Sequence, residues 1–296
     1  MVIATGFFDG VHLGHRFILR QLVEEARRRN DESMVVTFWP HPRNVLQDDA
    51  RNLRLLTSME EKKALIRSIG VDHIEVIPFT KEFCRLSAEE YLRDYIVGKF
   101  GGKAILVGYD NRIGSDQCTP EQTAEIARRL GLDVIRPERF VSDNGIVISS
   151  TKIRNSLQTG DIEEADSMLG YQYQLYGVVV SGNRLGHTIG FPTANMQLYE
   201  PLKLIPGNGV YLVKVETLGR VYDGMCNIGV RPTLGSGNAL TVETNIFDFN
   251  EDIYGLDIRL SFVRKIRNEV KFNDFSVLAG QLEKDREHCR ILLRKK

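Results

Sequence analysis

The residues best suited to chemistry lie near the start of the chain, in the run Gly6-Phe7-Phe8-Asp9-Gly10-Val11-His12-Leu13-Gly14-His15. This run falls where a predicted strand turns into a predicted helix, whose N-terminus offers free N–H groups to a phosphate. His12 and His15 share one face of that helix, and Gly10 and Gly14 allow the backbone to approach a ligand closely. Two imidazoles there could donate hydrogen bonds to the charge that develops at the α-phosphorus during adenylyl transfer. The alternative is a glycine-bearing turn with two incidental histidines.

Two further segments of the first half suit the same ligand. Ile148-Ser149-Ser150-Thr151-Lys152-Ile153-Arg154 opens a predicted helix with hydroxyls and two cations, which suits the β- and γ-phosphates that leave as pyrophosphate. Its alternative is a hydroxyl N-cap followed by solvated basic residues. Thr37-Phe38-Trp39-Pro40-His41-Pro42-Arg43 ends a predicted strand, and its prolines hold a rigid loop that could form a wall for a flat ligand. A purely structural loop explains this segment equally well.

A second glycine-rich run extends from Gly182 to Asn195 and follows a predicted strand of the second half. Its backbone amides and Arg184 could face phosphates, although the Gly-Lys-Ser/Thr ending of a Walker loop is missing. Thr193 and Asn195 are two residues apart, so in an extended segment their side chains point to the same side. A hydroxyl and an amide oxygen placed in this way could hold Mg²⁺. The alternative is a long glycine-rich hairpin loop.

The elements that must position these segments change type along the chain. The first half alternates strands with helices, which favours an α/β fold with a parallel sheet covered on both faces. The predicted strands are Val2–Phe7, Met34–Phe38, Ile74–Ile77, Ala104–Val107 and Val134–Ile135; the predicted helices are Gly14–Arg29 and those opened by Ser58/Glu61, Ser87/Glu90 and Thr119-Pro120, the last ended by Gly131.

The second half consists mainly of strand-like runs without intervening helices, which suggests an antiparallel barrel or sandwich. These runs are Gln172–Val180, Gly209–Glu216, Val221–Ile228, Leu240–Phe249 and Leu256–Val263, followed by an amphipathic helix at about Asp274–Leu293. We therefore expect two domains, 1–170 and 171–296.

Composition excludes several classes of protein. The 39 basic residues balance the 39 acidic ones, so no electrostatic argument favours nucleic acid or an anionic membrane as a partner. No apolar run approaches the roughly 18–20 residues that span a bilayer, and Met1-Val2-Ile3-Ala4 lacks the basic leader of a signal peptide. Cys84, Cys118, Cys226 and Cys289 are scattered, without metal or redox spacing. We expect reduced, mostly buried thiols in a cytoplasmic protein, which could still be a homo-oligomer.

Taken together, Gly6–His15, Thr37–Arg43 and Ser149–Arg154 resemble the prokaryotic bifunctional riboflavin kinase/FAD synthetase family, and the downstream half agrees. The resemblance implies a Rossmann-like nucleotidyltransferase domain that adenylylates FMN with ATP to give FAD and pyrophosphate, with His12 and His15 as catalytic residues. The residues implied to bind ATP are Gly6, Phe7, Asp9, Gly10, His12, His15, Ser150, Thr151 and Arg154. Those implied to bind the flavin are Pro40, His41, Pro42, Asp110 and Arg112.

The same resemblance implies that the second domain is a β-barrel riboflavin kinase, because Gly190–Asn195 (Gly-Phe-Pro-Thr-Ala-Asn) is similar to the signature of these kinases. Asn227–Thr233 and Val242–Phe249 are further family segments, and Glu243 matches the catalytic carboxylate that accepts the proton of the riboflavin 5′-hydroxyl. Without the resemblance, Glu243 reads as an exposed acid on a strand. The residues implied to bind ATP are Gly182, Arg184, Gly186, Gly190, Thr193, Asn195 and Asn227, with Thr193 and Asn195 as the Mg²⁺ ligands.

We therefore expect an enzyme that phosphorylates riboflavin to FMN and then adenylylates FMN to FAD, with ATP, riboflavin and FMN as its small-molecule partners. One departure leaves an alternative open. Asn111 and Ile113 stand where many relatives carry aromatic residues, so the chain could be a riboflavin kinase with weak or lost FMN adenylyltransferase activity. A flavin-sensing or nucleic-acid-binding module is the alternative from another class, and zero net charge argues against nucleic acid.

Overall fold

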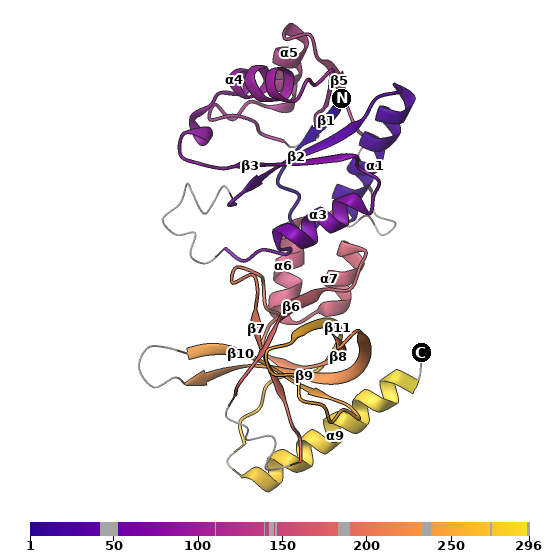
Figure 1. The fold of residues 1–296 in the computed structure, drawn as a ribbon, viewed down its shortest axis with the longest axis vertical. Coiled ribbons are helices and arrows are strands. Elements are labelled where there is room, and N and C mark those ends of the chain that lie inside the picture. The colour runs from indigo at the N-terminus through magenta and orange to yellow at the C-terminus, as the bar shows by residue number, and fades with distance from the viewer. Residues whose placement is uncertain are drawn as a thin grey trace. The chain divides into compact units, whose positions relative to one another are not determined.

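The computed structural model describes residues 1–41, 53–109, 111–138, 140–141, 145, 147–182, 190–232, 238–272 and 274–294. The chain divides into two compact units, Met1–Ser150 and Thr151–Lys296 (Figure 1). Four residues assigned to sites from the sequence lie outside the described residues: Pro42, Asp110, Arg184 and Gly186.

The first unit is built on a five-stranded parallel sheet with the order β3-β2-β1-β4-β5. Its strands are β1 (Val2–Thr5), β2 (Ser33–Trp39), β3 (His73–Pro78), β4 (Ala104–Leu106) and β5 (Asp133–Ile135). The central strands are buried throughout, as the apolar runs of a sheet covered on both faces require. The predicted parallel α/β fold is thus confirmed.

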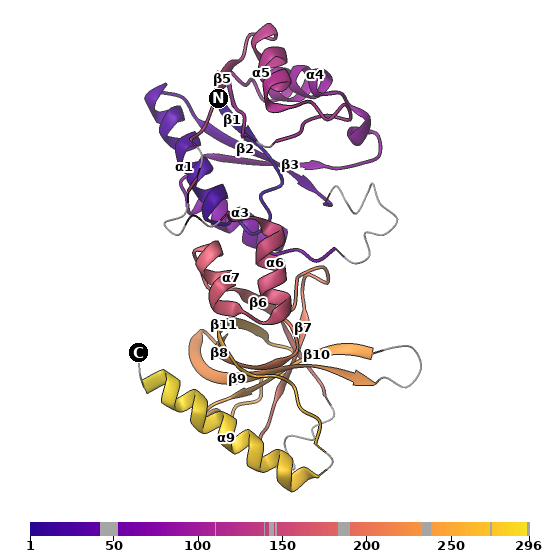
Figure 2. The same cartoon turned by 180° about the vertical axis from the view of Figure 1, so that it is seen from behind.

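Helices cover both faces of this sheet (Figures 1 and 2). One face packs against α1 (Leu13–Arg28) and α3 (Met59–Arg67). The other packs against α4 (Ala88–Tyr91), the π-helical segment Leu92–Lys99 that continues it, and α5 (Pro120–Arg129). A short 3₁₀ turn, Phe83–Arg85, precedes α4.

The predicted starts of these helices are confirmed by their capping contacts. The Ser58 hydroxyl accepts from the backbone N–H of Glu61, and the Glu61 carboxylate accepts from the N–H of Ser58. Ser87 and Glu90 form the same capping box before α4, as do Thr119 and Gln122 before α5. Such contacts span three residues, so they can be read directly from the sequence.

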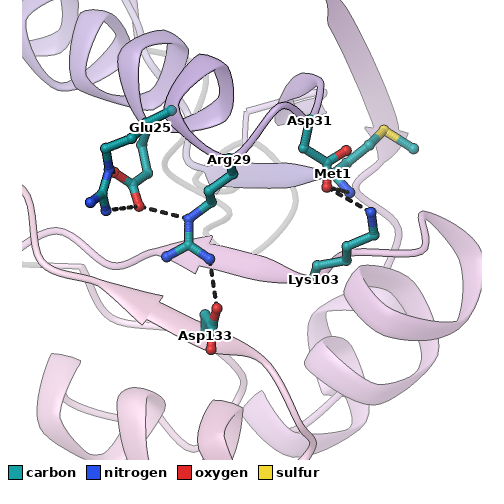
Figure 3. A network of polar contacts seen from close by, with 7 residues as sticks. Met1, Glu25, Arg29, Asp31, Lys103 and Asp133 are labelled. Atoms are coloured by element: carbon teal, nitrogen blue, oxygen red, sulfur yellow. Dashed lines mark hydrogen bonds and ion pairs between the residues drawn. The ribbon is translucent and has the colours of Figure 1, made fainter.

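A network of charged side chains joins α1 to the amino-terminal edge of the sheet (Figure 3). Arg29, just after α1, donates to Asp133 of β5 at 2.6 Å. The Asp31 carboxylate accepts from Lys103 at 2.9 Å and from the chain's terminal amino group at 3.2 Å, and hydrogen bonding to Lys103 lowers the pKa of Asp31. These partly exposed pairs each contribute little stability, but together they fix the C-terminal end of the helix whose N-terminus carries His12.

The second unit is a closed antiparallel barrel with the strand order β10-β7-β6-β11-β8-β9. Its strands are β6 (Gln174–Val180), β7 (Ala194–Leu198), β8 (Gly209–Thr217), β9 (Arg220–Pro232), β10 (Asn238–Ile246) and β11 (Asp257–Arg267). The barrel confirms one of the two architectures that the pattern allowed. The short strand β7 was not predicted, because its Ala-Asn-Met-Gln-Leu sequence has no β-branched residue.

Among the described residues of the second unit, three helices accompany the barrel. The long C-terminal helix α9 (Phe275–Arg294), yellow in Figure 2, packs along the barrel through a cluster that includes Cys289, Phe191 and Met225. The other two, α6 (Ser150–Thr159) and α7 (Ile162–Leu169), precede β6. They group with the barrel rather than with the α/β unit because Lys265 of β11 donates to the carbonyl of Thr159 at 3.1 Å, among other contacts.

Candidate active sites

The histidine-bearing loop follows the carboxyl end of β1 in a strained conformation. Phe8, Gly10 and Val11 all have positive φ values, of 50°, 80° and 36°, and positive φ in a β-branched residue is a genuine outlier. The buried Asp9 carboxylate holds the loop in place by accepting from the backbone N–H groups of Leu56 and Thr57 at 3.1 and 3.2 Å. Such strain is typical of functional sites, where the surrounding structure overrides local preference.

The two histidines of this loop lie at the start of α1, as predicted. His12 is the N-cap, and its Nδ1 accepts from the backbone N–H of His15 at 3.3 Å. The two rings stack with centroids 3.6 Å apart and an interplanar angle of 16°. A Cβ atom on Gly14 would lie 3.3 Å from the His12 ring, so the glycine leaves room for the stack.

Both imidazoles are held neutral at physiological pH. Burial lowers the pKa of His12 to about 4, although the negative charge of Asp9 opposes the shift. Burial lowers the pKa of His15 well below its usual value, and the neighbouring His12 and Lys62 lower it further. The buried His15 Nδ1 has no hydrogen-bond partner among the described residues. A neutral imidazole can still donate one N–H to a phosphate oxygen without bringing an extra charge.

The end of β2 and the residue that opens α6 both reach this loop. Trp39–Pro40 is a cis peptide bond, and the His41 ring that follows lies 3.8 Å, centroid to centroid, from the Phe7 ring. Ser150 donates its hydroxyl proton to the carbonyl of Asp9 at 3.0 Å. Fold contacts therefore join segments near residues 10, 40 and 150, which are remote in sequence.

Other residues assigned to this site from the sequence are not brought to the loop by described contacts. Arg112 is exposed and donates to the carbonyl of Gln117 at 3.2 Å, across a tight turn. Thr151 and Arg154 lie in α6, which belongs to the second unit. Their roles in binding the flavin or ATP stay predictions.

The two positions that depart from the family pattern have structural roles in the first unit. The Asn111 side-chain amide donates to the carbonyl of Thr5, the last residue of β1, at 3.1 Å. Ile113 is buried within the core cluster that also contains Tyr91 and Ile105. Asn111 therefore bonds to the end of the strand that leads into the loop, and Ile113 packs in the core on the other face of the sheet.

Sequence reasoning missed two residues next to the histidine loop. Thr57 accepts from the N–H of Gly10 at 3.2 Å. Lys62 of α3 is only 1% exposed, and its Nζ lies 3.9 Å from the centroid of the Phe7 ring. A signal existed: Lys62 and the buried Ile66 are four residues apart, so a cation occupies the apolar stripe of the helix.

The predicted kinase residues meet on adjacent strands of the barrel. Glu243 of β10 lies directly across from Asn195 of β7 and from Asn227 of β9, and opposed residues in antiparallel strands share a face. The Glu243 carboxylate accepts from the Thr241 hydroxyl at 3.3 Å. A Cβ atom on Gly182 would lie 2.2 Å from the Asn195 side-chain amide, so any larger residue there would force that amide to move.

Glu243 and Asn227 line a cavity of about 230 Å³ in the barrel unit, whereas Asn195 is not among its lining residues. Its polar lining comprises Thr193, Asn227, Glu243, Asn245, Arg267 and Glu269; its apolar lining comprises Phe191, Val210, Met225, Val270, Phe272, Phe275, Leu278 and Leu282. The Asn245 amide donates to the carbonyl of Pro192 at 2.8 Å and so fixes the segment before β7. An apolar enclosure with a few converging polar groups is the usual form of a small-molecule site.

The α9 wall of the cavity was also missed. Arg267 donates to the buried carboxylate of Asp285 through Nε at 2.9 Å and through a terminal nitrogen at 2.7 Å. Gln281, one turn earlier in α9, donates to the same carboxylate at 2.9 Å. An aspartate on the apolar stripe of an amphipathic helix was the available signal.

The first unit places paired histidines at a strand–helix junction, and the barrel places a carboxylate at an apolar cavity. Together they are typical of a transferase with two catalytic domains. A FAD synthetase family model matches residues 1–152, and a riboflavin kinase model matches residues 169–293. A Bacillus subtilis protein described as bifunctional riboflavin kinase/FMN adenylyltransferase is 36% identical to this chain, and the alignment covers 97% of this chain and 91% of the relative. The Escherichia coli protein of that description is also 36% identical, over 96% and 90%.

The chain therefore belongs to the bifunctional riboflavin kinase/FMN adenylyltransferase family. It is an enzyme of FMN and FAD biosynthesis that uses ATP, and the function predicted from the sequence is confirmed at this level. A solved structure described as a macrolide-efflux protein from Streptococcus pneumoniae has the same fold, with a TM-score of 0.88, 33% identity and coverage of 98% of this chain and 93% of that one. Among the described residues, no helix is long and apolar enough to cross a membrane.

Proposed function

We propose that residues 1–170 carry the FMN adenylyltransferase activity and residues 171–296 the riboflavin kinase activity. The separate matches of the two family models, over residues 1–152 and 169–293, support this division. The observation that carries the kinase assignment is the pairing of Glu243 with Asn195 and Asn227 beside the apolar cavity.

In the proposed kinase step, the Glu243 carboxylate accepts the proton of the riboflavin 5′-hydroxyl as its oxygen attacks the γ-phosphorus of ATP. The new bond joins that oxygen to phosphorus, the bond between the γ-phosphorus and the bridging oxygen breaks, and ADP leaves. The apolar lining of the cavity suits the largely apolar flavin ring. Positioning and charge neutralisation supply most of the acceleration of such a transfer, and a general base contributes about 10²–10⁴-fold.

In the proposed adenylyl transfer, a phosphate oxygen of FMN attacks the α-phosphorus of ATP, and the bond to the bridging oxygen breaks to release pyrophosphate. His12 and His15 donate N–H groups to the phosphates, with Gly6, Phe7, Asp9 and Gly10 shaping the loop. Neutral, desolvated imidazoles support this role because preorganised donors in a water-poor site stabilise developing charge strongly. No covalent intermediate with the protein is required.

The donor set of the barrel fits Mg²⁺. Thr193 and Asn195 supply a hydroxyl and an amide oxygen, and Glu243 supplies a carboxylate on the strand paired with Asn195. Mg²⁺ prefers hard oxygen ligands and keeps waters and substrate phosphates as its other ligands. When bound, the ion would neutralise charge on the transferring phosphates. We propose that Thr193 and Asn195 hold it, while Gly182, Gly190 and Asn227 contact ATP.

The kinase-only alternative is tested by incubating the full chain with riboflavin, ATP and Mg²⁺ and resolving the flavins by chromatography. The bifunctional assignment requires FMN to appear first and FAD afterwards. FMN that accumulates without FAD would favour the alternative. Asn111, which bonds to the end of β1, and Ile113, which fills the core, are both accommodated by the fold, and this supports the bifunctional outcome.

We also propose that the enzyme works in the cytoplasm with ATP, riboflavin and FMN as its partners, and without nucleic acid or membrane. The balanced charge supports the absence of a polyanionic partner. The four cysteines, all free and three of them buried, support a reducing compartment. Fractionation of cells, with flavin turnover measured in each fraction, tests the location.

A further inference from the structure

Lys62 occupies an unusual position for a lysine. It lies in the first turns of α3, where its backbone N–H donates to the carbonyl of the N-cap residue Ser58 at 3.0 Å. The helix start is tied to the histidine loop, because Asp9 accepts from the N–H groups of Leu56 and Thr57 just before it. This anchoring directs the side chain inward toward the loop, where its Nζ lies 3.9 Å from the centroid of the Phe7 ring.

Lys62 is a buried lysine whose ammonium group forms no ion pair within the part of the chain that the structure describes. The residue is 1% exposed, and among the described contacts no hydrogen-bond acceptor or ion pair serves its Nζ. Asp9 attracts it, but the Asp9 carboxylate already accepts hydrogen bonds from the backbone and from Thr57. A buried charge is costly unless it is paired and hydrogen-bonded, so an anion that binds beside Lys62 would offset part of that cost.

The charges and pKa shifts of the groups around the histidine loop favour the binding of an anion there. The titratable groups that face Lys62 are Asp9 and His15, and His12 is stacked on His15. Burial lowers the pKa of Lys62 to about 8 in spite of Asp9, and Lys62 in turn lowers the pKa of His15. The cation and the neutral imidazoles therefore all present donors in the same small region.

We propose that Lys62 is a phosphate-contacting residue of the adenylyl-transfer site, which donates charge-assisted hydrogen bonds to the triphosphate of ATP beside His12 and His15. The inference rests on the proposed function of the first unit. Lysine suits this role as a compact point charge on a flexible stem. It transfers no proton: it holds the phosphates and offsets their charge.

The test measures FAD formation from supplied FMN, with Mg²⁺ and varied ATP, in the full chain. Lys62→Met keeps the length of the stem and its contact with Phe7 but removes the charge, and it should lower kcat/KM for ATP about 10- to 100-fold. Lys63→Met is the matched control, because the neighbouring Lys63 forms only a surface pair with Glu60 at 3.0 Å. Fluorescence of Trp39, the single tryptophan of the chain, shows whether the first unit of each variant is folded, and FMN formation from riboflavin, measured on the same samples, reports the second unit.

A pH profile adds a readout that a merely structural lysine would not move. FAD formation by the unmodified chain should fall as the pH rises through about 8, where Lys62 loses its proton. Lys62→Arg should remove that fall, since a guanidinium stays protonated. If Lys62→Met loses both activities, the Lys62→Arg profile decides, and an unchanged fall overturns the proposal.

The proposal is also overturned if the Lys62→Met variant forms FAD at the unchanged rate when ATP is limiting. Failure of the proposed function looks different, because the unmodified chain itself would then make FMN and no FAD.

Discussion

The imidazole rings of His12 and His15 lie parallel, 3.6 Å apart, at the N-terminus of α1. Two charged imidazoles would repel each other at this distance, and burial prevents this by keeping the pKa of each ring low. The stack therefore presents two neutral donors from a rigid helix end. The adenylyl transfer that we propose for the first unit depends on that arrangement, while the second unit has its own carboxylate and cavity.

His15→Ala removes one of these donors. FAD formation from FMN should fall about 10²–10³-fold, the usual cost of losing one preorganised donor to a developing charge. FMN formation from riboflavin should not change, because it belongs to the barrel. Exposed His288 offers a control, and His288→Ala should leave both rates unchanged. Equal loss of both activities in His15→Ala would point to a single coupled site or to misfolding.

Glu243→Gln keeps the size of the side chain and removes the proton acceptor. Riboflavin phosphorylation should fall about 10²–10⁴-fold, while FAD formation from supplied FMN should persist. Glu251→Gln alters an exposed acid of the same unit and serves as the control. A Glu243→Gln variant with normal FMN production would refute the catalytic assignment.

Asp285→Ala removes the partner of Arg267 and leaves that guanidinium without its bidentate acceptor. Loss of one member of a buried pair costs about 3–5 kcal/mol, so the second unit should unfold at a much lower urea concentration. Loss of kinase activity in urea reports this transition. Fluorescence of Trp39, the single tryptophan of the chain, reports the first unit and should keep its midpoint. Glu283→Ala, which breaks only the surface pair with Arg286, should change stability by no more than about 1 kcal/mol.

Asp166 in α7 gives the second unit a pH-dependent stability. Burial raises the pKa of this carboxyl from 3.8 to about 7, although the hydrogen bond from the N–H of Tyr173 opposes the shift. The folded state therefore holds the proton more tightly than the unfolded state, and this contribution to stability is complete below pH 3.8 and lost as the pH rises through about 7.

Asp166→Asn should flatten that dependence, because the amide oxygen can still accept from Tyr173 and does not ionise. The urea midpoint of the second unit, compared at pH 4 and pH 8, measures the effect. Glu287→Gln, at an exposed position of α9, should retain the full dependence. An identical pH profile in Asp166→Asn and the unmodified chain would contradict the assignment.

Local contacts account for what could be read correctly from the chain. The capping boxes at Ser58, Ser87 and Thr119 each join residues three apart, so side-chain type and spacing suffice to predict them. The pairing of His12 with His15 is local in the same sense. By contrast, the sequence of β7 has a weak strand propensity, and the strand forms because β6 and β10 pair with it on either side. The π-helical geometry of Leu92–Lys99 has no sequence signal that we recognise.

By itself, then, the sequence determined the change from an α/β half to a β half, the starts of the helices capped by Ser58, Ser87 and Thr119, and the loop and strand residues that could handle phosphate. Only the tertiary structure decided which distant residues complete the sites. Lys62 reaches Phe7 because Asp9 anchors the start of α3, and Glu243 faces Asn195 because the barrel closes. Arg267 finds Asp285 only when α9 packs on β11. Such contacts join segments whose separation along the chain carries no periodic signal, and burial and strand register decide which of them meet.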